Sequence, residues 1–189
     1  MEKIFAPLSQ TQLGIYFECL RLNDKLAYNR HFLFTLDNSI ELYKLALAIE
    51  KAVAAHPYMF VKISEIDGVP QQIFETENYQ QKVLKMSEVE WKNFLQLRLN
   101  EPLELIGGQL FRFDLVETEN AKYFLRTAHH IIFDGTAYKV LFNDIAAAYE
   151  GKEIFSETYD SIDFANDEKN LRTQPTFNDA KNYYEKIFG

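Results

Sequence analysis

Two adjacent histidines, His129 and His130, precede Asp134 and Gly135 in the stretch of the chain with the clearest capacity for acid–base chemistry. Imidazole exchanges protons near neutral pH, so a positioned histidine is a natural general base. The pair ends an apolar run, and a helix-like segment follows Gly135. Because successive side chains on a strand point to opposite faces, only one histidine can face a given cleft. We therefore predict different roles for the two.

Other chemistries fit this stretch poorly. A metal site needs ligands that converge on one point, and adjacent strand positions diverge, so we expect no metal here. A serine hydrolase would show a Gly-x-Ser-x-Gly elbow, and the sequence has none. It also lacks a glycine-rich phosphate loop and a dinucleotide fingerprint.

The composition is that of one ordinary globular domain. The chain has 189 residues, of which 47% are hydrophobic and 25% charged. Its net charge of −8 argues against a nucleic-acid surface. No apolar run approaches the roughly 18 residues of a membrane span, and the N-terminus is not a secretory signal. Cys19 is the only cysteine, so we expect a packing residue and a reducing, cytoplasmic setting.

Periodicity and turn residues predict a mixture of helices and strands, and therefore an α/β or α+β domain with a layered sheet. Predicted strands cover residues 28–36, 60–66, 71–74, 81–86, 110–117 and 123–132, with a hairpin turn at Asp67-Gly68. Predicted helices follow Ser9 and Ser87, cover residues 40–55 and 136–149, and begin again at Thr176, with Phe177, Ala180, Tyr184 and Ile187 on one face. Residues 152–175 are polar and aperiodic, which indicates a linker.

The order strand, His-His, three residues, Asp-Gly and helix resembles the signature of the condensation-domain superfamily, acyltransferases built on the chloramphenicol acetyltransferase fold. The resemblance extends to Pro7-Leu8-Ser9-Gln10-Thr11-Gln12, to Glu101-Pro102-Leu103 through Gly108-Gln109-Leu110-Phe111-Arg112, and to Asp163-Phe164 with Tyr183-Tyr184. It therefore covers nearly all of the chain. It implies an α/β fold in which a layered sheet is flanked by helices, as one lobe of a two-lobed condensation domain.

The position of the motif indicates which lobe this is. In chloramphenicol acetyltransferases the motif lies close to the C-terminus, whereas here 54 residues follow Gly135. That placement is similar to the N-terminal half of a nonribosomal peptide synthetase condensation domain. We therefore expect residues 1–151 to form the N-terminal lobe, 152–175 a linker, and 176–189 a helix leading toward a second lobe. We expect a longer synthetase that begins at Met1.

The resemblance assigns roles to four residues. His130 corresponds to the histidine that deprotonates or orients the attacking amine, and His129 to a structural hydrogen-bonding residue. Asp134 corresponds to an aspartate whose ion pair holds the loop. Gly135 would permit a tight turn and the close approach of a pantetheine arm, and its amide would bind the developing oxyanion.

The sequence departs from the family after the second helix. The family usually shows Arg-His-x-x-Leu-Arg, and this chain has Ala55-His56-Pro57-Tyr58-Met59-Phe60. Both arginines are missing, and the second is the usual partner of the motif aspartate. The candidate partners of Asp134 are therefore Lys62, Arg112 and Arg126, and the alternative is that its carboxylate accepts only hydrogen bonds. We expect His31 and His56 to be structural.

The resemblance implies amide-bond formation between a carrier-bound acyl or peptidyl thioester and a carrier-bound aminoacyl amine. Phosphopantetheine would belong to the carrier proteins, and the partners would be those carriers and the C-terminal lobe of the same polypeptide. The isolated lobe is expected to be inactive, and the face of the last helix would pack on the second lobe or form a dimer. Two alternatives stay open: a non-catalytic module that binds a carrier or an acyl group, and a coenzyme A-dependent acyltransferase of the same superfamily.

Overall fold

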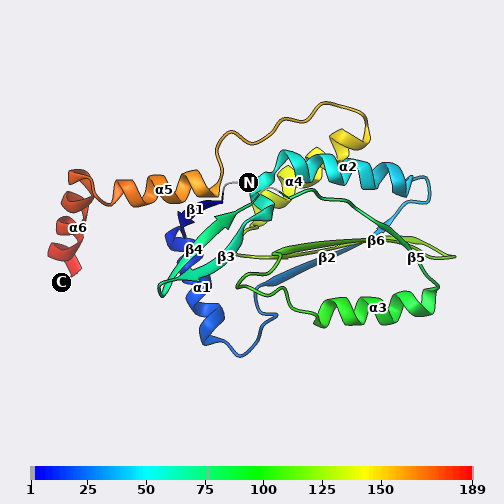
Figure 1. Ribbon diagram of the computed structural model, residues 1–189, viewed down its shortest axis with the longest axis horizontal. Helices are drawn as coiled ribbons and strands as arrows, with labels where there is room; N and C mark the ends of the chain where they lie inside the picture. Colours follow the sequence, from blue (N-terminus) through cyan, green and yellow to red (C-terminus); the bar gives the residue numbers. More distant parts are fainter. Residues whose placement is uncertain (1–2, 76, 189) are drawn as a thin grey trace.

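The larger of two sheets carries the histidine motif at the end of one of its inner strands. The computed structural model describes residues 3–75 and 77–188 (Figure 1). The sheet has the order β2-β7-β6-β5, with β5 parallel to β6 and the other neighbours antiparallel. Its strands are β2 (Asn29–Leu36), β7 (Lys122–His129), β6 (Phe111–Glu117) and β5 (Val83–Lys85).

The smaller sheet has the order β1-β4-β3, with strands β1 (Ile4–Pro7), β4 (Val69–Phe74) and β3 (Lys62–Ile66). The predicted hairpin is confirmed, because β3 and β4 pair antiparallel around Asp67 and Gly68. These two residues have φ angles of 51° and 77°, the left-handed conformation that a two-residue hairpin turn requires. Sequence patterns did not predict β1.

Helices cover both faces of the larger sheet (Figure 1). The helices are α1 (Gln10–Arg21), α2 (Leu42–Ala55), α3 (Glu88–Asn100), α4 (Gly135–Tyr149), α5 (Ser161–Leu171) and α6 (Pro175–Phe188), with a 3-10 turn at Pro57–Phe60. On one face α2 and α4 pack into the main apolar core, to which Ile49, Val53 and Leu141 contribute. On the other face α3 places Trp91 against Val116 and Leu125.

The helix starts follow the predicted capping patterns. The Ser9 side chain accepts from the Gln12 backbone amide, and the Ser87 side chain accepts from the Glu90 amide. In both capping boxes the side chain of the third helical residue, Gln12 or Glu90, accepts in turn from the backbone amide of the serine. The last helix differs from the prediction, because it begins at Pro175 and not after a Thr176 cap. Proline is well suited to a first helical position, because an N–H group at that position would have no hydrogen-bond partner within the helix.

The prediction of an irregular linker over residues 152–175 is wrong for α5. Asp160 caps this helix by accepting from the amides of Ile162 and Asp163. Its buried side holds only Ile162 and Ala165, too narrow an apolar face to give a periodic pattern. The α5 helix packs beside β1, and the Gln10 amide donates to Glu168 Oε2 at 2.7 Å. The segment is therefore part of the folded body, and α6 extends beyond it (Figure 1).

Strand β7 ends at His129, earlier than the predicted residue 132. The chain turns there because the Ile132 amide donates back to the His129 carbonyl at 3.2 Å. We call residues 130–134, between β7 and α4, the motif loop. No helix of the described residues is long and apolar enough to cross a bilayer.

Candidate active site

The His130 ring is held by the motif loop. Its backbone N–H donates to the Tyr28 carbonyl at 2.8 Å, and its Nδ1 lies 2.8 Å from the Phe133 carbonyl oxygen. Because a carbonyl can only accept, Nδ1 carries the hydrogen, and the neutral ring keeps its lone pair on Nε2. The residue as a whole is half-buried, and Nε2 is the ring nitrogen that this geometry leaves able to accept a proton.

The His129 ring has a separate and more enclosed environment. It is 2% exposed, and its Nδ1 accepts from the Ile131 amide at 3.2 Å. The hydrogen of the neutral ring therefore lies on Nε2, 3.8 Å from Cys19 Sγ. Burial, helped by the neighbouring His130, lowers the pKa of His129 to about 4. A neutral, buried ring fits the predicted structural role and not proton transfer near neutral pH.

Asp134 caps α4 in place of forming an ion pair. Its Oδ1 accepts from the amides of Thr136 and Ala137 at 2.9 and 2.8 Å, and the residue is exposed. Among the described residues it pairs with no cation, so of the two alternatives the structure has hydrogen bonds alone and no ion pair with Lys62, Arg112 or Arg126. Lys62 instead pairs with Glu77 at 2.6 Å. The helix amides satisfy the carboxylate, which removes the need for a cation.

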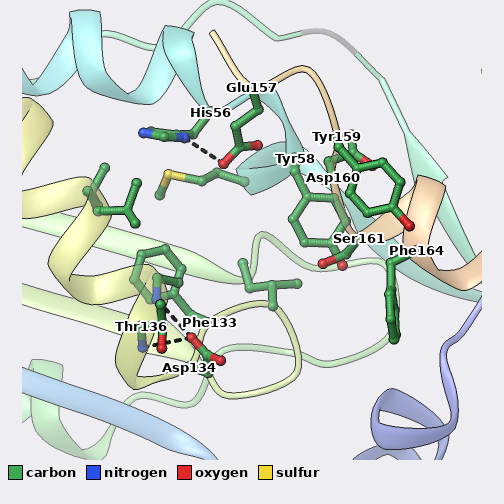
Figure 2. Close-up of a pocket in the computed structure, with 15 residues that line it drawn as sticks. His56, Tyr58, Phe133, Asp134, Thr136, Glu157, Tyr159, Asp160, Ser161 and Phe164 are labelled. Carbon is green, nitrogen blue, oxygen red and sulfur yellow. Dashed lines mark hydrogen bonds and ion pairs between the residues drawn. The ribbon is translucent and has the colours of Figure 1, made fainter. Parts of the chain in front are cut away.

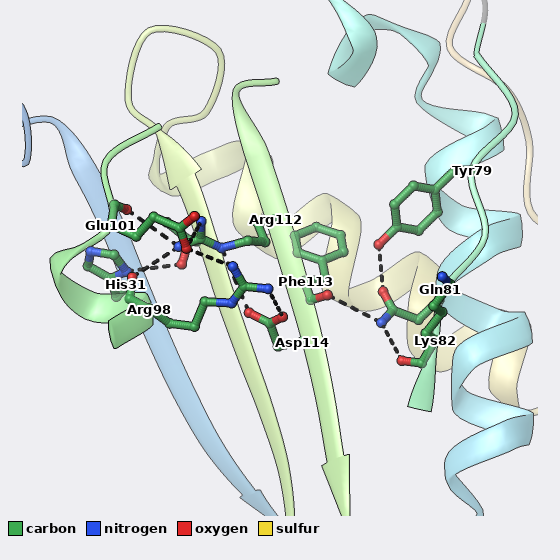
Figure 3. A network of polar contacts seen from close by, with 10 residues as sticks. His31, Tyr79, Gln81, Lys82, Arg98, Glu101, Arg112, Phe113 and Asp114 are labelled. Carbon is green, nitrogen blue, oxygen red and sulfur yellow. Dashed lines mark hydrogen bonds and ion pairs between the residues drawn. The ribbon is translucent and has the colours of Figure 1, made fainter. Parts of the chain in front are cut away.

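Arg112 belongs to a network on the α3 face of the sheet (Figure 3). Its Nη1 lies 2.8 Å from Glu101 Oε2, and its Nη2 donates to the Arg98 carbonyl at 3.0 Å. Arg98 also pairs with the buried Asp114 at 3.2 Å. Burial raises the pKa of Asp114, and the two arginines oppose that change. This network joins α3 to β6, and none of its ion pairs includes Asp134.

Arg126 is fully buried on β7, and its guanidinium forms no hydrogen bond within the described residues. Its guanidinium carbon lies 3.6 Å from the ring centre of Tyr138 and 4.2 Å from that of Phe133. Burial lowers its pKa to about 9, so it remains charged at neutral pH. The third candidate partner of Asp134 is therefore a cation enclosed by aromatic rings.

Gly135 opens α4 and is not among the described glycines with positive φ, so its backbone is in a conformation that other residues also adopt. A Cβ built at Gly135 meets nothing within 4 Å. The space beside this residue is open, which leaves room for a ligand to approach.

A hollow of about 310 Å³ lies between the start of α4 and the start of α5 (Figure 2). Asp134, Glu157 and Asp160 bring carboxylates to its lining, and Tyr58 and Phe164 bring rings. His130 is not among its lining residues. The hollow and the candidate base therefore use different parts of the motif loop.

His56 bridges two carboxylates at the edge of this hollow. Its Nδ1 lies 2.6 Å from Glu157 Oε1, shown in Figure 2, and its Nε2 lies 2.7 Å from Asp144 Oδ2. The hydrogen bond to Glu157 raises the pKa of His56, burial opposes this, and Asp144 adds to the rise. The partners are 88 and 101 residues away in sequence, so no local pattern could have indicated them.

A family model described as a condensation domain matches residues 2–189. The chain belongs to the condensation domain family.

Curated relatives are large synthetases. The chain is 24% identical over 186 residues to tyrocidine synthase 3 of Brevibacillus parabrevis, covering 97% of this chain and 3% of that protein. It is 27% identical over 192 residues to the hybrid PKS-NRPS synthetase xenE of Xenoacremonium sinensis, covering 99% of this chain and 5% of that protein. The chain therefore spans a small part of the relatives it matches.

Solved condensation domains have the same fold. A mutant of the starter condensation domain of the rhizomide synthetase RzmA matches with a TM-score of 0.80 at 16% identity, covering 97% of this chain and 48% of that one. The condensation domain of the monacolin K polyketide synthase MokA matches with a TM-score of 0.82 at 15% identity, covering 98% and 43%. The predicted layered α/β fold is confirmed, and the chain spans about half of each domain.

Substitutions at Asp134 distinguish capping from ion pairing. Asp134→Ala removes both amide acceptors and should destabilise the chain by about 1 kcal/mol, whereas Asp134→Asn keeps an acceptor and should cost less than about 0.5 kcal/mol. Urea unfolding measures both values. An equal loss in the two variants would show that the charge, and not the cap, is what matters.

The His56 bridge predicts a pH-dependent stability. Because its pKa is raised in the folded protein, the imidazolium stabilises the fold below the ordinary histidine pKa of about 6.5. This contribution is lost as the pH rises through the raised value. The loss of melting temperature caused by His56→Gln should therefore be larger at about pH 5.5 than at about pH 8.5.

His31 supplies a control of opposite sign. Burial, with a contribution from Arg112, lowers its pKa, so its stabilising contribution is present at high pH and lost as the pH falls. The effect of His31→Gln on the melting temperature should grow with pH. The same pH trend in both variants would contradict the assignment for His56.

Proposed function

We propose that this chain is the N-terminal lobe of a condensation domain that forms amide bonds on carrier proteins. The acyl or peptidyl donor is a thioester on one carrier, and the acceptor is the amine of an aminoacyl thioester on another. The C–N bond forms as the thioester C–S bond breaks, and the amine loses a proton while the departing sulfur gains one. Phosphopantetheine is brought by the carriers.

The observation that supports this proposal most is the 2.8 Å contact between His130 Nδ1 and the Phe133 carbonyl. It leaves Nε2 able to accept a hydrogen bond or a proton from the attacking amine. The membership of the chain in the condensation domain family supports this use of the histidine.

His130, as general base, has to supply only part of the rate acceleration of amide formation. A neutral amine is already a good nucleophile toward a thioester, and holding the two together gives effective molarities of about 10⁵ M or more. A positioned general base contributes about 10²–10⁴-fold. His130 accordingly serves in this proposal to orient the amine and to accept its proton.

The start of α4 offers a second element of the site. The first amides of a helix have no partner within the helix. Asp134 occupies those of Thr136 and Ala137, and open space adjoins Gly135, the first helical residue. We assign the Gly135 amide to the developing oxyanion of the thioester carbonyl.

The α6 helix leads to the second lobe in this proposal. None of its described residues is buried, and Tyr183, Tyr184 and Ile187 are more than half exposed. An apolar helix surface of this kind is normally covered by another element. The match of this chain to about half of the length of solved condensation domains supports a second lobe as that element.

The isolated lobe would then lack half of its substrate channel and be inactive. A carrier-dependent enzyme with a free thiol at Cys19 suits the reducing cytoplasm.

The test uses the full polypeptide that contains this chain. Two carrier proteins are loaded with aminoacyl-pantetheine, and dipeptidyl transfer is followed by intact mass under single-turnover conditions. His130→Ala should slow transfer by about 10²–10⁴-fold, the contribution of a positioned base. His31→Ala replaces a histidine of the same sheet and should leave the rate near that of the wild type.

Three other results are informative. Equal transfer by the wild type and His130→Ala would contradict the proposed role of the base. Carrier binding without transfer would indicate a docking module. Turnover of acyl-coenzyme A in place of loaded carriers would indicate a coenzyme A-dependent acyltransferase.

A further inference from the structure

Arg126 is a charge in a place where an apolar side chain would be expected. It lies in the middle of β7, opposite Phe32 of β2 and Phe113 of β6. Its side chain is fully buried, and Nε and both Nη atoms have no hydrogen-bond partner within the described residues. A buried cation without a counter-ion opposes folding. Its presence calls for a role other than filling space.

The guanidinium contacts one ring at the end of the motif loop and one ring in the first turn of α4. Its carbon is 4.2 Å from the ring centre of Phe133 and 3.6 Å from that of Tyr138. The two rings also meet each other edge to face at 4.9 Å, and Phe32 closes the cluster at 4.7 Å from Tyr138. A cation over aromatic faces is attracted to the ring electrons, most strongly where water is excluded. Arg126 therefore holds together the end of the motif loop and the first turn of α4.

Phe133 connects this cluster to the candidate base. Its ring packs on Arg126, and its carbonyl accepts the Nδ1 hydrogen of His130 at 2.8 Å. A displacement of the ring would move this carbonyl, and with it the His130 ring and the position of its Nε2. Reaction rates are sensitive to such displacements, since about 1 Å of misplacement costs about 10²-fold.

We propose that Arg126 is a positioning residue for His130, which it orients through the Phe133 carbonyl without touching substrate. The proposal rests on the proposed function, because it assigns the purpose of the contact to the base of amide formation. Burying the charge of Arg126 destabilises the fold locally. Its contact with Phe133 fixes the orientation of the His130 imidazole.

The informative substitution is Arg126→Met. Methionine fills a similar volume, has no charge and packs well against aromatic rings. Replacing a buried ion by an apolar side chain is often neutral or stabilising. We expect an equal or higher melting temperature, a rate constant for transfer lower by about 10- to 100-fold, and a nearly unchanged KM. A purely structural residue would instead change melting temperature and rate in the same direction.

Two further variants complete the test in the full polypeptide. Arg126→Lys keeps the charge, but its ammonium lacks the planar face that stacks on rings, so its rate should be intermediate. This variant also tests the proposal if Arg126→Met does not fold. Leu125→Met is the matched control, because Leu125 is the fully buried neighbour on the other face of β7, against Trp91. It should leave the rate unchanged.

Amide hydrogen exchange of residues 130–137 provides a readout independent of activity. In Arg126→Met these amides should exchange faster, while those of residues 122–125 keep the wild-type rate. A wild-type transfer rate together with wild-type exchange in the loop would overturn the proposal, as would a rate that falls only in step with melting temperature. If His130→Ala transfers as fast as the wild type, the proposed function fails, and exchange in the loop still decides whether Arg126 orders it.

Discussion

The hydrogen bond from His130 Nδ1 to the Phe133 carbonyl is the contact on which the proposed chemistry depends. A histidine on a loop can rotate and exchange tautomers, and either change would remove the lone pair from the place where an amine must present its proton. The hydrogen bond joins His130 to a residue only three positions further along the chain, so the motif loop itself holds the ring. The surrounding structure must then keep the loop in one conformation.

Three separate contacts fix that loop. Strand β7 ends beside β2, where the His130 amide bonds to the Tyr28 carbonyl. The carboxylate of Asp134 ties the far end of the loop to the first amides of α4. The guanidinium of Arg126, on β7, packs on the rings of Phe133 and Tyr138. The two histidines also differ in burial: His129 is enclosed, which lowers its pKa and keeps it neutral, whereas His130 is half-buried.

Local patterns predicted most of the fold, because the forces that form these elements act over a few residues. The capping boxes at Ser9 and Ser87, the Asp67-Gly68 turn and the apolar face of α2 each depend on near neighbours. The α5 helix was missed because only two of its side chains are buried. Strand β1 is held by its pairing with β4, far along the chain, and that pairing leaves no local signal.

The candidate site was predictable only in part. The motif identified His129, His130, Asp134 and Gly135, and the resemblance suggested an ion pair for the aspartate. The structure shows helix capping instead, which depends on where α4 begins. The bridge from His56 to Asp144 and Glu157, and the aromatic surroundings of Arg126, join distant segments and required coordinates to be found.

The proposed chemistry requires that His130 carry its hydrogen on Nδ1 and present a free lone pair on Nε2. Nitrogen NMR of histidine-labelled protein, with the His130 signals identified by their loss in His130→Gln, measures this directly in the polypeptide that contains the chain. At a pH where the ring is neutral, we expect a protonated Nδ1 and an unprotonated Nε2. A signal showing the hydrogen on Nε2, or rapid exchange between the two tautomers, would contradict it.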